Sequence, residues 1–408
     1  MKLKFTWPTS AIALWLCMVP SSQAQLSIHY DFTPGSVVPD NNGQLSIVQN
    51  LGGLSGLSSI SDVNVRLNLT SGTPGNPMVL GDLYSSLTFG NSSETQSTAV
   101  FLNRPGRDNS SVFGSSLSSL NVTLDDSAST NVFNATSSTG TYKADGRLAV
   151  NPNAAGVAYV AGSNGLSALN VTPSTSNRVT LVVADYSQGG LATLSGWGFG
   201  TTGTAAASGT FTPGANSSLS DGGSGDTNTI GAILSVTGAS GGSMQLNFAG
   251  TTTFSNGVTG SAGITKTGSG TVILEGNSAY TGATNANAGK LLINGSTSST
   301  SLVTVANGAT LGGSGSIGGS VTVQGGGIFA PGSSVESIDT GNLALLASAV
   351  FAQEIDKSVL PGISGDLTAT TGSLSITSGA ILTLNELGTS SAWEIGNSIT
   401  LIGYSTGT

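Results

Sequence analysis

The chain has 408 residues, of which 8% are charged, 38% are apolar and 60 are glycine. This apolar fraction is too high for a disordered chain, and the abundance of glycine around short alternating segments is typical of all-β proteins. The net charge of −9 does not favour nucleic acid or anionic lipid as partners.

Residues 1–24 have the three parts of a secretory signal peptide. Two lysines precede the apolar segment AIALWLCMVP, and Ser22 and Ala24 then occupy positions −3 and −1 of a cleavage site. The apolar segment is too short to span a bilayer, and no later run of 18 apolar residues predicts a transmembrane helix. Cys17, the only cysteine, leaves with this segment. Cleavage leaves nine Lys and Arg against 20 Asp and Glu, a net charge of −11. We therefore expect a secreted, acidic chain without disulfides.

Residues 26–200 predict an all-β sandwich, because short segments alternate apolar and polar residues between Gly, Pro, Asn and Ser. No sustained helical period is present. The predicted strands are residues 62–70, 81–90, 97–103, 120–126, 178–185 and 191–199.

The motifs of this half, in their order, resemble the P domain that accompanies the catalytic domain of proprotein convertases and kexin-like proteases. The matching segments are VVPDNNG, ISDVNVRLNLT, GDLYSSL, VFLNRPGR, NVTLDDSA, GTYKADGRL and VTLVVADYSQGGLATLSGWGF. The resemblance implies a jelly-roll-like β-sandwich. Two features depart from the family pattern: Val179 stands where the family usually has Trp, and residues 154–176 match poorly.

The same resemblance implies a calcium site, since P domains often hold Ca²⁺ and this ion prefers several hard oxygen ligands. The candidate ligands lie in the matching motifs and are Asp82, Asp125, Asp126 and Asp145. The alternative is that Asp82 and Asp126 cap turns through side-chain hydrogen bonds.

Residues 201–408 contain no Arg and only three Lys, and they carry an internal repeat. The segments TNANAGKLL, TVANGATL, TVQGGGIF, LALLASAVF and SITSGAIL align on Gly289, Gly308, Gly326, Ser348 and Gly379, in steps of 19, 18, 22 and 31 residues. A period near 20 residues, with turns at Gly or Asn, predicts the coils of a right-handed β-solenoid. We expect four apolar residues to point inward, namely Leu291, Val305, Val323 and Ile376.

The longest unit, residues 263–296, is similar to the autotransporter-associated β-strand repeat. The motifs K-T-G-S-G-T, A-Y-T-G and A-G-K-L-L follow one another in this unit. The resemblance implies a bacterial secreted or cell-surface protein.

Gly313, Gly315 and Gly318 fit the dinucleotide fingerprint G-x-G-x-x-G. That fingerprint requires a following helix and an acidic residue about 20 positions later. Here an alternating strand pattern, GSVTVQGGGIF, follows Gly318. We therefore predict that these glycines serve tight turns and close coil stacking rather than nucleotide binding.

The sequence offers little for catalysis. A Ser-His-Asp triad needs an imidazole base, and the only histidine, His29, precedes the first predicted strand. The G-x-S-x-G match at residues 238–242 lacks the strand-to-helix context of a nucleophile elbow. A glycosidase needs two facing carboxylates, and Glu354 and Asp356 lie two residues apart and would share one strand face. We favour the alternative that they form a solvated strand end before KSVLPG. We expect no catalytic residues and no peptidase activity.

The sequence thus favours a secreted, non-catalytic structural or adhesion protein, with a β-sandwich that binds an extracellular protein or glycan and a solenoid stalk. Two alternatives stay open: an accessory module of a separate serine endopeptidase, and a solenoid that binds or hydrolyses glycans. The last residues, LIGYSTGT, have the pattern of a strand interior, so we expect the chain to be truncated at its C-terminus.

Overall fold

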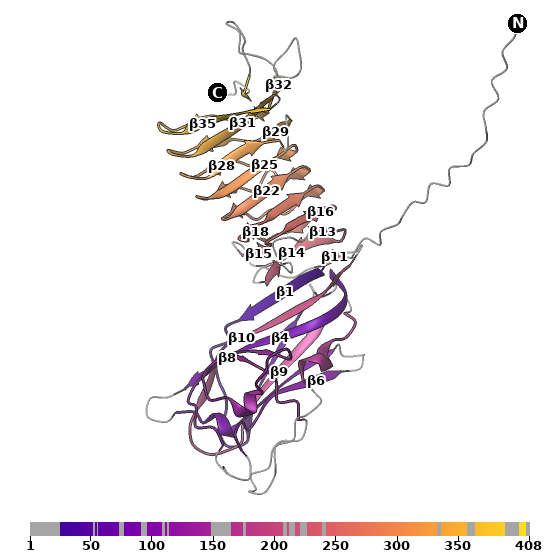
Figure 1. The fold of residues 1–408 in the computed structure, drawn as a ribbon, viewed down its shortest axis with the longest axis vertical. Helices are drawn as coiled ribbons and strands as arrows, with labels where there is room; N and C mark the ends of the chain where they lie inside the picture. Colours follow the sequence, from indigo (N-terminus) through magenta and orange to yellow (C-terminus); the bar gives the residue numbers. More distant parts are fainter. Residues whose placement is uncertain are drawn as a thin grey trace, which may run out of the picture.

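A computed structural model provides the three-dimensional structure (Figure 1). It describes residues 25–51, 54, 56–72, 77–90, 96–107, 111, 114–147, 165–173, 177–206, 210–211, 217–220, 227–238, 242–332, 336–356, 364–387 and 400–404. Strands form nearly all the regular structure in these residues, which confirms the all-β class. The helical segments there include the 3₁₀ turns η2 (Leu80–Asp82), η3 (Val132–Asn134) and η4 (Leu166–Leu169).

Ten of the described strands form two mainly antiparallel sheets in the N-terminal part. The first contains β1 (Gln25–Phe32), β10 (Ala192–Ala205), β4 (Leu57–Ser71) and β7 (Leu120–Asp125), with β2 (Ser36–Val37) and β8 (Thr139–Tyr142) at its margins. The second contains β3 (Gly43–Asn50), β9 (Arg178–Asp185), β5 (Leu83–Gly90) and β6 (Ser97–Asn103).

The strand pairs of these two sheets are nested along the chain. β1 pairs with β10, β3 with β9, β4 with β7, and β5 with β6, all antiparallel. A long hairpin folded over on itself gives this order, which is that of an eight-stranded jelly roll. The bounds of β6 and β9 are those predicted, whereas β1 and β3 lie outside the predicted strands and β10 continues past residue 200 to Ala205.

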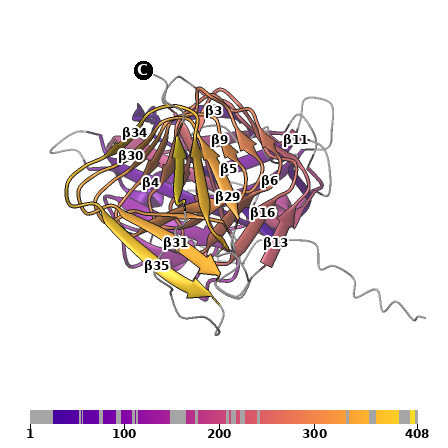
Figure 2. The same cartoon turned by 90° about the horizontal axis from the view of Figure 1, so that it is seen from above.

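The C-terminal part is a β-solenoid whose coils stack through parallel strands on three faces (Figures 1 and 2). The first face holds β12 (Ser217–Ser220), β15 (Ser243–Asn247), β18 (Gly263–Lys266), β21 (Thr284–Ala286), β24 (Val303–Val305), β27 (Val321–Val323), β30 (Leu343–Leu345) and β34 (Leu374–Ile376). The second holds β13 (Thr227–Ile230), β16 (Thr251–Phe254), β19 (Thr271–Leu274), β22 (Gly289–Ile293), β25 (Ala309–Gly313), β28 (Ile328–Pro331), β31 (Val350–Asp356) and β35 (Ile381–Leu387), with β32 (Ser364–Gly365) antiparallel to β31. The third holds β11 (Thr210–Phe211), β14 (Ile233–Val236) and β17 (Val258–Gly260), and then β20 (Asn277–Ser278), β23 (Ser296–Thr297), β26 (Ser316–Ile317), β29 (Ser337–Thr340), β33 (Leu367–Thr370) and β36 (Ile402–Tyr404).

The predicted repeat frame is confirmed at the corner between the first and second faces. All five aligned residues have positive φ, between 64° and 90°. Their backbones also link successive coils: Gly308 N–H donates to Gly326 O at 3.0 Å, Gly326 N–H to Ser348 O at 2.8 Å, and Ser348 N–H to Gly379 O at 2.8 Å. The predicted solenoid is therefore present, while the right-handed winding of its coils stays a prediction.

Three of the four residues predicted to point inward are buried: Leu291, Val305 and Val323. The prediction is wrong for Ile376, which is 57% exposed. Ile376 aligns with Leu345 in the parallel register, but β34 ends its sheet in the described part of the chain. Without a further coil against it, this position stays open to solvent.

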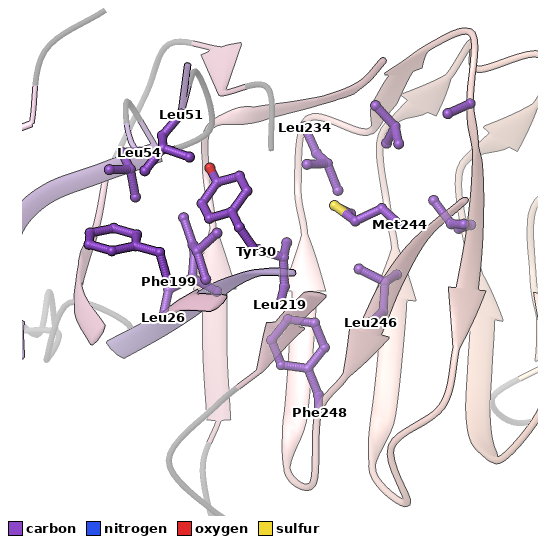
Figure 3. Close-up of a cluster of buried hydrophobic side chains, with 14 of the residues drawn as sticks. Leu26, Tyr30, Leu51, Leu54, Phe199, Leu219, Leu234, Met244, Leu246 and Phe248 are labelled. Atoms are coloured by element: carbon purple, nitrogen blue, oxygen red, sulfur yellow. The ribbon is translucent and has the colours of Figure 1, made fainter. Parts of the chain in front are cut away.

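The jelly roll and the solenoid share one sheet and one core. β12 pairs antiparallel with the outer edge of β1, from Ser27 against Ser220 to Tyr30 against Ser217. Apolar side chains continue across this junction, as Figure 3 shows for Leu26, Phe199 and Leu219. Backbone pairing and core packing thus join the two parts at this edge.

Candidate functional site

Two of the four predicted calcium ligands form ion pairs with arginine. Arg107 Nη2 lies 2.5 Å from Asp82 Oδ1. Arg147 contacts both oxygens of Asp145, Nε to Oδ1 at 2.6 Å and Nη2 to Oδ2 at 2.7 Å. Arginine is a planar, bidentate partner for a carboxylate, so both side chains already have a cationic partner in the structure.

The other two predicted ligands accept backbone hydrogen bonds. Asp125 Oδ1 accepts the N–H of Ser127 at 2.7 Å. Asp126 accepts the N–H groups of Leu166 and Ser167, at 3.2 and 2.7 Å, which satisfies donors at the start of η4. In the described residues, no three His, Cys, Asp or Glu side chains gather in a way that could hold a metal ion. Calcium binding by the four aspartates stays a prediction.

Asp82 belongs to a partly buried charged cluster at the ends of β5 and β9. Arg104 Nη2 lies 3.9 Å from Asp82 and donates to Ser187 Oγ at 3.2 Å. Asp185 is buried there and accepts the N–H of Ser187 at 3.2 Å. Burial raises the pKa of Asp185 to about 6, and the negative charges of Asp82 and Asp40 act in the same direction. Through its contacts with Asp82 and Ser187, Arg104 connects the start of β5 with the end of β9.

The glycines of the nucleotide-like motif pack against the neighbouring coil, as predicted. A Cβ on Gly313 would lie 2.3 Å from Ile293 O, and one on Gly315 would lie 2.0 Å from Gly295 O. β27 follows Gly318, where a dinucleotide site would need a helix. Close packing between neighbouring coils therefore explains why glycine occupies these positions.

Two kinds of hydrolytic site were considered from the sequence, a Ser-His-Asp triad and a glycosidase pair of carboxylates. His29 lies within β1, where it pairs with Gly200 and Ser218, so it does not precede the first strand as expected. Of the G-x-S-x-G segment, residues 239–241 lie outside the described residues. Glu354 and Asp356 do share the outward face of β31, as predicted, because the residues of this strand alternate in burial.

The coil formed by the repeat unit of residues 263–296 has buried polar side chains in its interior. Lys266 is fully buried at the inward end of β18, and its Nζ donates to Gly268 O and, at 3.3 Å, to Ala288 O. Tyr280 is also fully buried, and its hydroxyl bonds to Thr284 Oγ1. The K-T-G-S-G-T and A-Y-T-G motifs therefore supply side chains that satisfy corner carbonyls and hydroxyls inside the coil.

A cavity of about 150 Å³, with both polar and apolar residues in its lining, lies on the second face, where β31 meets β32. Its lining is Lys290, Ala330, Pro331, Gly332, Ala352, Gln353, Glu354, Asp366 and Asn385. Asp366 follows β32, and its two oxygens accept the N–H groups of Glu336 at 3.2 Å and Glu354 at 2.7 Å. Burial raises the pKa of Asp366, and the charges of Glu354 and Glu336 add to the effect.

Gln353 is the unusual member of this lining. Its side chain is fully buried, and neither its amide nitrogen nor its amide oxygen has a hydrogen-bond partner in the structure. The sequence pattern indicated Glu354 as a candidate carboxylate but indicated neither Gln353 nor Asp366. One signal was available: a Gln at the inward position of the alternating segment VFAQEID.

Residues 264–293 match the family model of the passenger-associated-transport-repeat. This match covers the coil that contains Lys266 and Tyr280. No helix in the described residues is long and apolar enough to cross a membrane. No curated protein matches the chain. The repeat match and the β-solenoid together fit a secreted or cell-surface structural protein.

Proposed function

We propose that the chain is a secreted surface protein in which a solenoid stalk presents a jelly-roll binding module. The observation that carries this proposal is the antiparallel pairing of β12 with β1, which continues the solenoid sheet into the jelly roll. A stalk and a module that share backbone hydrogen bonds and a core keep a fixed relative position. Adhesion to an extracellular protein or a glycan is the role that such an arrangement serves.

The P-domain resemblance supports the assignment of the N-terminal half as a binding module. The nested strand order is the jelly roll that the resemblance implies. We keep the division into a module of residues 26–200 and a solenoid of residues 201–408 as part of this proposal. The accessory role beside a separate serine endopeptidase rests on the same resemblance and has no further observation in its favour.

The case for secretion through residues 1–24 rests on their sequence pattern, in which Ser22 and Ala24 precede the predicted cleavage site. In the mature chain that this pattern predicts, β1 (Gln25–Phe32) is the first described strand. Because β1 pairs on both edges, with β10 and β12, its first residues are held in the sheet rather than in a free terminus.

Expression of the full chain in a Gram-negative host tests the secretory part of the proposal. We expect mass spectrometry to find a mature protein that begins at Gln25, outside the cytoplasm. Ala24→Arg is the control, because an arginine at position −1 should block cleavage and leave the precursor. Recovery of the wild-type chain in the cytoplasm with residues 1–24 attached would contradict the proposal.

A further inference from the structure

The outward side of the second solenoid face carries an apolar strip. Strands β19 to β35 of this face stack one above another (Figure 1), and their parallel register aligns the outward positions of successive coils. The apolar outward residues include Ile273, Leu292, Ile328, Ala330, Val350 and Ile381. Leu292 lies over Gly312, since a Cβ on that glycine would be 3.3 Å from Leu292 Cδ2, and Ile381 is 47% exposed. The strip therefore presents apolar side chains to solvent along the stack.

The other two faces of the solenoid are polar on the outside. On the first face, four successive strands have the outward residues Thr265, Asn285, Thr304 and Thr322. On the third face, three successive strands have Asn277, Ser296 and Ser316. Strands that are apolar on both sides are typical of sheets that are covered on both faces. The apolar strip therefore has the composition of a surface that a partner covers.

The geometry of the strip favours a flat partner over an extended peptide. β22, β25 and β28 each pair with a neighbouring strand on both edges. Their backbone groups are therefore occupied, and a peptide cannot add to this sheet as a further strand between them. A partner can contact only the outward side chains, which is how two sheets pack face to face at a distance of about 10 Å.

The strip is complementary to itself in size. A two-fold axis that is parallel to the strands and lies midway between β25 and β28 would place β22 over β31 of a second copy. By the register of the stack, Leu292 would then face the partner's Ala352, and Gly312 would face the partner's Ala330. The large side chain meets a small one, and the glycine leaves room for an alanine.

The charges at the two ends of the strip are complementary as well. Lys290 is an outward residue of β22 and Glu354 is an outward residue of β31. The same two-fold axis places each lysine over the strand that carries the partner's glutamate, and opposite charges across an interface favour the matching orientation. A second copy in the parallel orientation would bring Lys290 to the level of the partner's Lys290 instead.

We propose that two copies of the chain pack antiparallel through the apolar strip, with their jelly rolls at opposite ends of the pair. The six overlapping strands cover about 29 Å by about 15 Å, from ~4.8 Å per strand and ~3.3 Å per residue, which is roughly 400 Å² from each copy. About 800 Å² in total is below the ~1,200 Å² of stable complexes, so the dimer is transient, with a dissociation constant of about 100 µM. This inference goes beyond the proposed function, because a single stalk can be secreted and can present its module without it.

Sedimentation equilibrium of the full mature chain, from about 10 to about 500 µM, tests for the dimer. We expect Ile328→Asp to raise the dissociation constant at least tenfold, because a carboxylate at the centre of the interface would lose its water. The matched control is Thr304→Asp, which adds the same charge at an outward position of the first face, and we expect it to leave the constant unchanged. Equal melting temperatures of the two variants would show that the difference comes from the interface and not from folding.

Charge reversal tests the antiparallel register independently of the apolar substitution. Lys290→Glu and Glu354→Lys should each weaken the dimer, because each places like charges at both ends of the interface. The double variant restores opposite charges, so we expect its dissociation constant to return to the wild-type value.

Cross-linking with a short bismaleimide gives a second measure of the register. The two-fold axis places Thr271 opposite the partner's Ile381, so a mixture of Thr271→Cys and Ile381→Cys should cross-link far more than either variant alone. Four outcomes would overturn the proposal. They are a monomer at every concentration, an unchanged dissociation constant in Ile328→Asp, cross-linking within each cysteine variant but not in the mixture, and binding of the monomer to phosphatidylcholine vesicles that Ile328→Asp abolishes.

Discussion

At the scale of single residues, the backbone conformation of the repeat corner explains which residue type each coil uses. Four coils place glycine there, and one places Ser348, all at positive φ. An L-residue in this region has a conformational cost of about 1–2 kcal/mol, so the serine coil carries a strain that the glycine coils do not.

Ser348→Gly should therefore stabilise the chain by about 0.5–1 kcal/mol, after allowance for the greater freedom of glycine in the unfolded state. Ser348 is exposed and its corner hydrogen bonds come from the backbone, so the substitution keeps them. Equilibrium urea denaturation measures the change. Gly308→Ala is the opposite control, because a Cβ there meets nothing within 4 Å, and its cost of about 1 kcal/mol would report backbone strain alone. An unchanged or lower midpoint for Ser348→Gly would contradict the argument.

Asp185 predicts a pH dependence of stability. Its folded-state pKa of about 6 lies above the ordinary value of 3.8, mainly because the carboxyl is buried. Between pH 4 and pH 6 the folded state therefore binds more protons than the unfolded state, and the free energy of unfolding falls as pH rises. The difference of roughly two pKa units corresponds to about 3 kcal/mol, all of it lost above pH 6.

Asp185→Asn should flatten this part of the stability profile, as urea midpoints at half-unit steps from pH 4 to pH 7 would show. The free energy of unfolding of Asp185→Asn should still fall slightly as pH rises, because Asp62 and Asp366 also have a raised pKa. Asp31→Asn is the control, because Asp31 forms an exposed ion pair with Arg66 at 2.9 Å and such pairs contribute little. Parallel profiles for wild type and Asp185→Asn would refute the assignment.

At the scale of the secondary-structure element, the repeat coil depends on polar groups inside an apolar stack. Lys266 occupies an inward position that aligns with Ala286 in the next coil, and its ammonium group satisfies carbonyls at the corner. Removal of one partner from a buried hydrogen bond leaves the other unsatisfied, at a cost of about 1–3 kcal/mol.

Lys266→Met should accordingly lower the free energy of unfolding by about 2–4 kcal/mol, because Gly268 O and Ala288 O would both lose a donor. The control is Lys290→Met on β22, where the lysine is partly exposed; we expect a change below about 0.5 kcal/mol. Equilibrium urea denaturation of the wild type and the two variants measures both changes in the free energy of unfolding. Equal effects of the two substitutions would show that burial of Lys266 has no special role.

Local sequence patterns predicted the elements whose own residues determine them. The short apolar run in STAVFLN was sufficient for β6, and the alternation that begins RVTLVVAD was sufficient for β9. The spacing of Gly289, Gly308, Gly326 and Gly379 was sufficient for the corner. Local sequence patterns do not predict contacts between segments that are distant along the chain. Ser217–Ser220 is short and polar, so nothing local indicates that β12 pairs with β1, about 190 residues earlier.

The candidate cavity was missed for the same reason. Gln353 and Asp366 come together only because β32 folds back on β31. Ile376 shows the converse: its pattern correctly places it in the inward column, but burial depends on a neighbouring coil that β34 does not have in the described chain. Periodicity determines which way a side chain points, whereas tertiary neighbours determine what it meets.

At the scale of the whole molecule, the central claim is that jelly roll and solenoid form one rigid body through the β1–β12 junction. One hydrophobic core extends from Leu26 and Phe199 to Leu246 and beyond (Figure 3). A binding module that is fixed to its stalk in this way presents its surface in a constant orientation, unlike a module on a flexible linker.

Spin-label distance measurements test this claim most directly, and the chain from Gln25 onward contains no cysteine to interfere. Labels at Val48→Cys in the jelly roll and Leu302→Cys in the solenoid use exposed positions, at 51% and 58% exposure. The pair Leu302→Cys and Leu346→Cys, within the solenoid, gives the reference width. We expect a single distance between the two parts, with a distribution as narrow as the reference. A distribution several times broader, as a flexible tether would give, would contradict the account.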